Sequence, residues 1–269
     1  MLRNKDYGVL LQENTENAAE YASEELRTLG YTIIDSGFTA DQVSDISVAF
    51  DATWLQYTQK FSATFLQSLD EQNIMRAPLT LGNLIFLDLI TNKKLTNVLK
   101  SSIIGKFILN QQNGVINPPD NEYSQSAWHR DLPYQHFIAS NPIAISALYC
   151  VDDFTKKNGA THVLPASHKV IKFPSKKFLE NHATQIEAKA GQYILLDSMI
   201  FHCGGFNQTK KPRRAVNHVF TIPHIRQQIN LQELVKEINV DPDQKEILGI
   251  GIDSVSSIEQ YLSLKARRV

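Results

Sequence analysis

The sequence predicts a mainly β fold in which helices buttress a jelly-roll, cupin-like barrel. The main reason for this prediction is that apolar patterns typical of helices come first in the chain and patterns typical of strands follow. Through about residue 105 of the 269, apolar side chains recur at spacings of three and four, as in amphipathic helices. From about residue 106, short apolar runs alternate with clusters of turn residues such as Asn117–Asn121, as in antiparallel strands. Helices followed by many short strands favour a barrel with helical support.

The helical part begins with a helix expected over 15–29 and a short strand over 30–35, and it ends with a helix over 95–104. Between them, Thr39 to Gln42 has the form of a capping box, so a long helix is predicted to begin there. One face of that helix is an aromatic stripe, which indicates core packing rather than a cofactor surface: Ile46, Phe50, Trp54, Tyr57, Phe61, Phe65 and Leu69.

The barrel part is predicted to contain strands over 107–112, 126–131, 142–151, 191–197, 199–203 and 213–222. In the last of these, alternate residues face opposite sides. Arg213 shares a face with small side chains such as Ala215, as expected beside a cavity, whereas Arg214 shares a face with bulky ones such as Phe220. Arg213 is therefore predicted to point into the barrel and Arg214 away from it, provided that no bulge separates them.

We expect one domain over residues 1–269, with mainly helical support over 1–105, the jelly-roll core over 106–223 and a C-terminal extension over 224–269. The 42% of hydrophobic residues supply an ample core. A net charge of -1 gives no basic excess for binding nucleic acid, and no apolar run approaches the roughly 18 residues of a membrane span.

The N-terminus lacks the apolar segment of a secretory signal, and the two cysteines, Cys150 and Cys203, lie in apolar segments. These features predict a cytoplasmic protein whose two thiols are reduced and mostly buried. They give no indication of the oligomeric state.

The most informative motif is His129-Arg130-Asp131, which is followed by His202 and, eleven residues later, by Arg213. On a strand, residues i and i+2 point to one face, so His129 and Asp131 can aim at a single point. Two histidines and a carboxylate form the facial triad of non-haem Fe(II) oxygenases, with open positions for a co-substrate and dioxygen. Arg213 can hold the far carboxylate of that co-substrate through two parallel hydrogen bonds.

Nearby residues offer alternatives to these assignments. His162 and His168 are rival metal ligands, although His168 fits a structural role better. Arg214 competes with Arg213 for the co-substrate, and strand parity favours Arg213.

The stretch from roughly 106 to 230 resembles the phytanoyl-CoA dioxygenase family of Fe(II)/2-oxoglutarate oxygenases. The resemblance rests on three motifs in order: WHRDLPY, DDFTKKNGATHVLPASHK at 152–169, and GQYILLDSMIFHCGGFNQTKKPRRA. It implies a double-stranded β-helix with iron held by His129, Asp131 and His202. It also implies that 2-oxoglutarate pairs with Arg213 and that dioxygen is the second co-substrate.

The chain departs from the family at two loop positions, Ala166, where glycine is frequent, and Gln192, where aspartate is common. Neither position supplies a metal ligand in the family pattern. Related halogenases replace the triad carboxylate with a small residue, so Asp131 favours hydroxylation or another oxidation over halogenation.

Other polar side chains are candidates for the remaining contacts. Partners of the co-substrate are expected on the strands that lead to the metal ligands: Asn110, Gln111 and Gln125. Substrate contacts are expected at the mouth of the site and from cationic side chains that also fit surface roles: Tyr134, His136, Arg76 and Arg226.

We therefore expect an Fe(II)/2-oxoglutarate-dependent dioxygenase that hydroxylates a small molecule and releases succinate and CO2. Desaturation or ring closure would use the same triad. A non-catalytic jelly-roll ligand-binding protein is an alternative, although it needs no such triad. A zinc-dependent isomerase or hydrolase is another, although zinc prefers tetrahedral sites. The segments that would shape substrate choice, 70–85, 132–140 and 224–235, contain no decisive motif.

Overall fold

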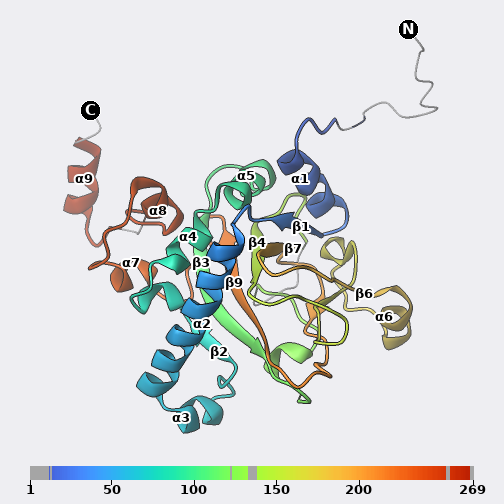
Figure 1. Cartoon of the computed structure of the whole chain (residues 1–269). Helices are drawn as coiled ribbons and strands as arrows, with labels where there is room; N and C mark the ends of the chain where they lie inside the picture. The colour runs from blue at the N-terminus through green and yellow to red at the C-terminus, as the bar shows by residue number, and fades with distance from the viewer. Residues whose placement is uncertain (1–11, 13, 122, 133–137, 253–254, 267–269) are drawn as a thin grey trace.

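The computed structural model describes residues 12, 14–121, 123–132, 138–252 and 255–266, and its centre is an antiparallel sheet (Figure 1). The sheet has six strands in the spatial order β1-β7-β4-β9-β3-β2. Their bounds are β1 Tyr31–Asp35, β2 Ile74–Arg76, β3 Ile108–Asn117, β4 Ala144–Cys150, β7 Gln192–Asp197 and β9 Arg213–Thr221. Apart from β2 and β3, neighbours in this order are not consecutive strands in the chain, so the sheet has the crossed connections of a jelly roll rather than of a simple meander.

A smaller sheet of three strands lies against one half of the large one. Its order is β6-β5-β8, with β5 at His162–Val163, β6 at Thr184–Gln185 and β8 at His202–Cys203. Single bridges extend it, including one between His129 and His202. The two facing sheets form the double-stranded β-helix, and the predicted fold class is confirmed.

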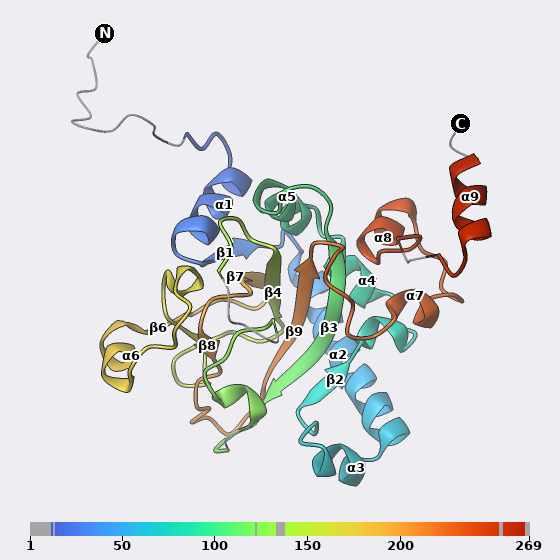
Figure 2. The ribbon, with the colours of Figure 1, turned by 180° about the vertical axis from the view of Figure 1, so that it is seen from behind.

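Helices surround the two sheets. The bounds are α1 Ala18–Thr28, α2 Ala40–Phe61, α3 Ala63–Ser68, α4 Ile85–Ile90, α5 Lys93–Ser102, α6 Lys176–His182, α7 Leu231–Leu234, α8 Pro242–Ile247 and α9 Ile258–Ala266. Figure 2 shows α6 and the small sheet on one side of the molecule, with α7, α8 and α9 on the opposite side. No helix in the described ranges is long and apolar enough to cross a membrane.

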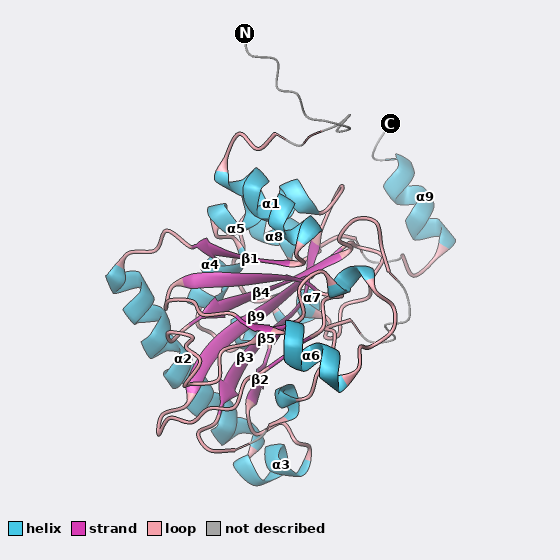
Figure 3. Ribbon diagram, turned by 90° about the vertical axis from the view of Figure 1, so that its right-hand side faces the viewer, coloured by secondary structure: helices cyan, strands magenta, loops and turns pink. Residues whose placement is uncertain are grey.

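Strand β7 shows how the large sheet separates two cores. Tyr193 and Leu195 pack into a cluster with Phe50 of α2 and Leu99 of α5, whereas Ile194 belongs to a second cluster toward the small sheet. Figure 3 shows α2 to one side of the strands and α6 to the other. The period of two along the strand therefore directs one face to the helices and the other to the barrel interior.

The long helix α2 begins at the predicted capping box, because Thr39 caps the Gln42 amide and the Gln42 side chain returns to the Thr39 amide. It ends at Phe61, because Ser62 adopts a left-handed backbone with φ 62. The prediction that the stripe continues through Phe65 and Leu69 was wrong, since both of these side chains are more than half exposed. The change of direction at Ser62 turns α3 away from the core.

Two predicted strands are shorter than the sequence suggested. The segment 126–131 is not a regular strand: a short 3-10 helix occupies Ser124–Ser126, and only His129 makes a bridge. The strand expected over 199–203 is reduced to His202–Cys203. Isolated hydrogen bonds to other segments, rather than continuous strand pairing, hold these two segments in place. An apolar pattern in the sequence does not reveal such bonds.

The C-terminal extension packs on the helical side of the molecule. Leu231, Val235, Ile247 and Leu248 belong to the main hydrophobic cluster, whereas α9 has no buried residue. The assignment of the whole chain to one domain stays a prediction.

Candidate metal centre

His129, Asp131 and His202 converge at the opening between the two sheets. Nε2 of His129 lies 3.7 Å from Oδ1 of Asp131, and Nε2 of His202 lies 3.5 Å from the same oxygen. All three ligand atoms lie within 4.8 Å of one another. Cis ligands that share an ion at about 2.1 Å are roughly 3 Å apart, so small movements of the side chains bring the three atoms around one metal.

The backbone fixes the two histidines relative to each other. The His129 amide donates to the His202 carbonyl at 2.9 Å, and the His202 amide donates to the His129 carbonyl at 3.1 Å. Nδ1 of His129 donates to the Ala127 carbonyl and Nδ1 of His202 to the Ile200 carbonyl, at 2.7 and 3.1 Å. A proton on each Nδ1 leaves each Nε2 with its lone pair free, as a metal ligand requires.

Asp131 is oriented by two serines. The Ser146 hydroxyl donates to Oδ2 of Asp131 and lies 2.8 Å from the Ser198 hydroxyl. The Asp131 amide donates to the Ser198 carbonyl at 3.0 Å. Because Oδ2 is engaged, Oδ1 is the oxygen that faces the two imidazoles, as in a monodentate ligand.

The electrostatics of the cluster favour a bound cation. Burial raises the pKa of Asp131, but the charge and hydrogen bonds of the neighbouring His202 and His129 outweigh burial and hold that pKa well below its usual range. Burial lowers the pKa of His129, and the hydrogen bond and charge of Asp131 overcome this and raise it. The carboxylate thus stays ionised beside two imidazoles that protons would otherwise charge. A divalent metal held between the three groups would take the place of those protons.

Arg213 lies in the same cavity as the triad and is buried, with 4% of its surface exposed. Its Cζ lies 3.8 Å from the centre of the Phe154 ring, and its Nε has no partner among the described residues. Burial lowers its pKa, while the nearby Tyr123 hydroxyl raises it through charge and a hydrogen bond. The cavity therefore contains a buried cation with unused hydrogen-bonding capacity, and the predicted inward orientation of Arg213 is confirmed.

Tyr123 reaches this cavity because Gly204 leaves room for it. A Cβ atom on Gly204 would lie 2.3 Å from the Tyr123 hydroxyl oxygen. The Gly204 amide donates to the Gln125 carbonyl at 2.7 Å, which connects the segment before His129 to the segment after His202.

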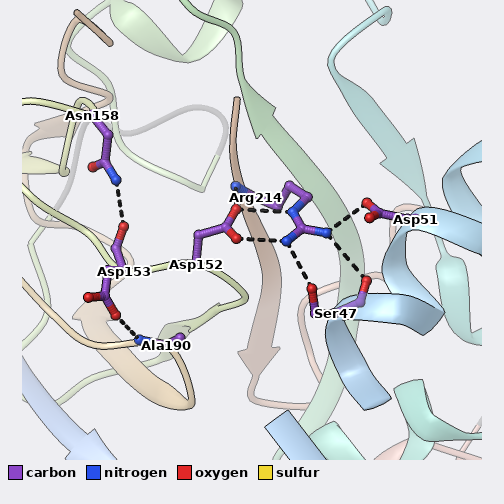
Figure 4. A network of polar contacts seen from close by, with 7 residues as sticks. All are labelled: Ser47, Asp51, Asp152, Asp153, Asn158, Ala190 and Arg214. Atoms are coloured by element: carbon purple, nitrogen blue, oxygen red, sulfur yellow. Dashed lines mark hydrogen bonds and ion pairs between the residues drawn. The ribbon is translucent and has the colours of Figure 1, made fainter. Parts of the chain in front are cut away.

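Arg214 points the other way, toward helix α2 (Figure 4). Its guanidinium pairs with Asp152 and Asp51 at 2.7 Å each and donates to the Ser47 hydroxyl at 2.9 Å. Strand β9 pairs with β4 without a register shift, so no bulge inverts the two arginines.

The predicted partners of the co-substrate are only partly brought together. Gln125 lines the triad cavity, but Asn110 and Gln111 are not among the residues described as lining it. Asn110 Nδ2 donates to the Arg226 carbonyl at 2.9 Å, because a bulge in β3 between Leu109 and Gln111 turns it toward the C-terminal extension. Gln111 accepts a hydrogen bond from a neighbouring asparagine instead.

The candidate substrate residues lie apart from the triad or outside the described residues. Tyr134 and His136 fall in the second group. Arg76 forms an ion pair with Glu71 at 2.5 Å, and Arg226 lines a separate groove near the C-terminal extension. Their roles in substrate binding stay predictions.

Several residues of the site were not anticipated. Tyr123, Ser146 and Ser198 contact Arg213 or Asp131, and of these Ser146 carried a signal, as a polar residue inside the apolar run of β4. His168 is buried and bonds to the Arg27 carbonyl at 3.1 Å, which fits the structural role expected for it.

The two departures from the family pattern have local explanations. Ala166 adopts a left-handed backbone with φ 61, a conformation that glycine reaches without strain. Gln192 accepts a hydrogen bond from the Lys189 amide at 2.8 Å, a role that a shorter aspartate side chain can also fill.

The two sheets, together with the intact His-Asp-His triad in their opening, define the Fe(II)/2-oxoglutarate-dependent dioxygenase superfamily. Residues 26–215 match the model of the family described as phytanoyl-CoA dioxygenase (PhyH), and the chain belongs to this family.

Relatives and solved structures agree with this assignment. An uncharacterized protein of Mycobacterium tuberculosis is 31% identical over 172 residues, which cover 60% of this chain and 62% of that protein. EctD from S. alaskensis, solved with 2-oxoglutarate and 5-hydroxyectoine, superposes with a TM-score of 0.66 at 19% identity over 82% of each chain. SnoN, a non-haem epimerase of nogalamycin biosynthesis, superposes with a TM-score of 0.57 at 16% identity over 84% of this chain and 90% of its own.

Proposed function

We propose that this chain is an Fe(II)/2-oxoglutarate-dependent dioxygenase that hydroxylates a small molecule, with release of succinate and CO2. The observation that carries the proposal is a His-Asp-His triad that shares one cavity with the buried, partly unpaired guanidinium of Arg213. Bound Fe(II), with 2-oxoglutarate and dioxygen, supplies the oxidising chemistry.

In this proposal His129, Asp131 and His202 hold the iron through Nε2, Oδ1 and Nε2. Three ligands on one face leave positions open for a chelating co-substrate and dioxygen. The hydrogen bond from Ser146 keeps the second oxygen of Asp131 away from the metal and so preserves those open positions.

Arg213 binds the far carboxylate of 2-oxoglutarate. Its planar guanidinium can donate two parallel hydrogen bonds, and its burial strengthens the pairing because solvent does not screen it. Phe154 beneath the guanidinium and the Tyr123 hydroxyl beside it fix its orientation.

The same site supports other outcomes after the oxidising step. Desaturation and ring closure use the same ligand set, and the similarity to the epimerase SnoN adds epimerisation to this group. A non-catalytic ligand-binding role explains neither the fixed triad nor the buried arginine. We infer action on a small molecule in the cytoplasm, where Cys150 and Cys203, both free and buried, would stay reduced.

The test is succinate formation. The purified chain is incubated with Fe(II), 2-oxoglutarate and dioxygen, and succinate is measured with and without candidate small molecules. Succinate that requires both iron and 2-oxoglutarate supports the proposal, and product masses distinguish hydroxylation from desaturation. Wild-type protein that forms no more succinate than the His202→Ala variant contradicts it.

A further inference from the structure

We propose that Asn113 and Asn217 form the substrate-recognition wall of the iron cavity and select a neutral small molecule that carries hydroxyl or amide N–H donors. This inference rests on the proposed function and specifies the substrate class of the same site.

Asn113 on β3 and Asn217 on β9 are cross-strand partners on the inner face of the large sheet. Asn217 lines the triad cavity. The neighbours of Asn113 face the helices: the Gln112 side chain bonds to backbone in the helical layer, and a Cβ on Gly114 would meet the Met75 side chain at 2.6 Å. Val115, two residues further along β3, lines the triad cavity as Asn217 does. Alternation along β3 therefore places Asn113 on the same inner face, next to Asn217 and just outside the residues described as lining the cavity.

The pair lies one row from Ser146, the serine that bonds to the triad carboxylate. Val219 follows Asn217 on the same face of β9 and pairs with Ser146, which donates to Asp131. Arg213 precedes Asn217 by two rows. A molecule bound against the two amides would thus lie close to the triad carboxylate.

Each amide presents a buried acceptor without a donor. Oδ1 of Asn113 and Oδ1 of Asn217 have no partner among the described residues, and Asn113 is only 7% exposed. The amide nitrogen of Asn113 donates to the side-chain oxygen of Gln111 at 3.2 Å, so the nitrogen is engaged while the oxygen has no partner among the described residues. Buried acceptors of this kind destabilise a folded protein unless a donor reaches them, so they mark a position where a ligand supplies one.

The co-substrate cannot supply these donors, because the carboxylates and the keto group of 2-oxoglutarate are acceptors. Among the described lining residues, Asp131 is the only acidic side chain and Arg213 the only arginine or lysine. Iron and 2-oxoglutarate engage both, so a charged group of the substrate finds no counter-ion. An acyl chain would leave two acceptors buried without donors, whereas a neutral molecule with hydroxyl or amide groups satisfies both.

A first experiment compares the thermal stability of two leucine variants of adjacent residues. Gln112 is the matched control, because its amide is fully used by the Leu79 amide and the Phe86 carbonyl at 2.9 and 2.8 Å. Gln112→Leu should lower the melting temperature by several degrees. Asn113→Leu should leave it unchanged or raise it, because an unpaired acceptor is removed. An equal loss in both variants would show that the Asn113 amide is structural and would overturn the proposal.

A second experiment measures succinate formed by the full chain with Fe(II) and 2-oxoglutarate in the presence of three panels: neutral sugars and amides, aliphatic carboxylates, and fatty acyl methyl esters. We expect stimulation above the substrate-free rate by members of the first panel alone. For a stimulating compound, kcat/KM should fall roughly 10- to 100-fold in Asn113→Leu, since the bound donor is left unpaired.

The outcomes separate this inference from the function on which it rests. Stimulation confined to carboxylates or esters, or by no panel above the background rate, overturns the substrate class while the oxygenase function stands. A raised KM for 2-oxoglutarate in Asn113→Leu would show that the Asn113 amide binds the co-substrate, and this result also overturns the proposed substrate class. Protein that forms no succinate under any condition refutes the proposed function itself.

Discussion

Three side chains hold the metal in the proposed site, and each contributes a ligand that its neighbours cannot replace. His129→Ala, Asp131→Ala and His202→Ala should each remove Fe(II)-dependent succinate formation, because two remaining ligands bind a divalent ion weakly. Metal content after dialysis and succinate yield are the measurements. Full activity in any one variant would exclude that residue from the triad.

Arg213 should determine the affinity for 2-oxoglutarate. Loss of one partner from a buried charge pair costs on the order of 2–5 kcal/mol, or roughly 30- to several-thousand-fold in affinity. Arg213→Ala should raise the KM for 2-oxoglutarate by that factor with iron binding retained. Arg213→Lys should recover only part, because lysine lacks the planar fork. The KM for 2-oxoglutarate is measured in these two variants and in Arg214→Ala. A large increase in Arg214→Ala alone would assign co-substrate binding to Arg214 instead of Arg213.

His218 should make stability depend on pH. It is fully buried and donates from Nδ1 to the Ala147 carbonyl at 2.9 Å, and burial lowers its pKa to about 4. In the unfolded chain the His218 imidazole binds a proton near pH 6.5, whereas in the folded protein it stays neutral until about pH 4. The folded state therefore loses stability as the pH falls from about 6.5 toward 4. The loss from this group is on the order of 3 kcal/mol. Melting temperatures of wild type and His218→Asn should converge at low pH. Parallel curves would contradict this account.

Between elements, Arg214 connects strand β9 to the end of β4 and to helix α2 (Figure 4). The side chain of Asp152 is 28% exposed and that of Asp51 is 68% exposed. Asp152→Ala should therefore destabilise the protein by about 1–3 kcal/mol, because it removes a bidentate, partly buried partner. Asp51→Ala should cost less than about 1 kcal/mol, as exposed pairs do. Urea unfolding of both variants tests the order, and a larger loss for Asp51→Ala would contradict it.

Elements with strong local signals were predictable from the sequence, and those held by long-range contacts were not. The capping box at Thr39 and the alternation along β9 are local, and both are confirmed. The segment before His129 has an apolar pattern but lacks a neighbouring strand along most of its length, so it is not a regular strand. Asn110 was misjudged because the bulge beside it reverses its orientation, and a bulge depends on pairing that one segment does not reveal.

For the whole molecule, the last helix and the preceding segments should contribute unequally to stability. Removal of residues 256–269 deletes α9, which has no buried residue, and should change the melting temperature little. Removal of residues 230–269 also deletes Leu231, Val235 and Leu248 from the main hydrophobic cluster. Each buried leucine lost costs roughly 2–5 kcal/mol, so this truncation should unfold the chain. Circular dichroism and thermal scans of both truncations provide the test, and a folded shorter form would show that the extension is dispensable.

The paired hydrogen bonds between the backbones of His129 and His202 have a consequence for which metal the protein acquires. Because this pairing uses backbone atoms alone, it does not depend on which ion the side chains hold. Imidazole and carboxylate ligands bind Co(II), Ni(II) and Cu(II) more tightly than Fe(II). Occupancy is therefore set by the supply of metals around the protein. A purified sample that contains nickel or copper reports the composition of its growth medium or column, and reloading with Fe(II) after chelation restores the form that reacts with dioxygen.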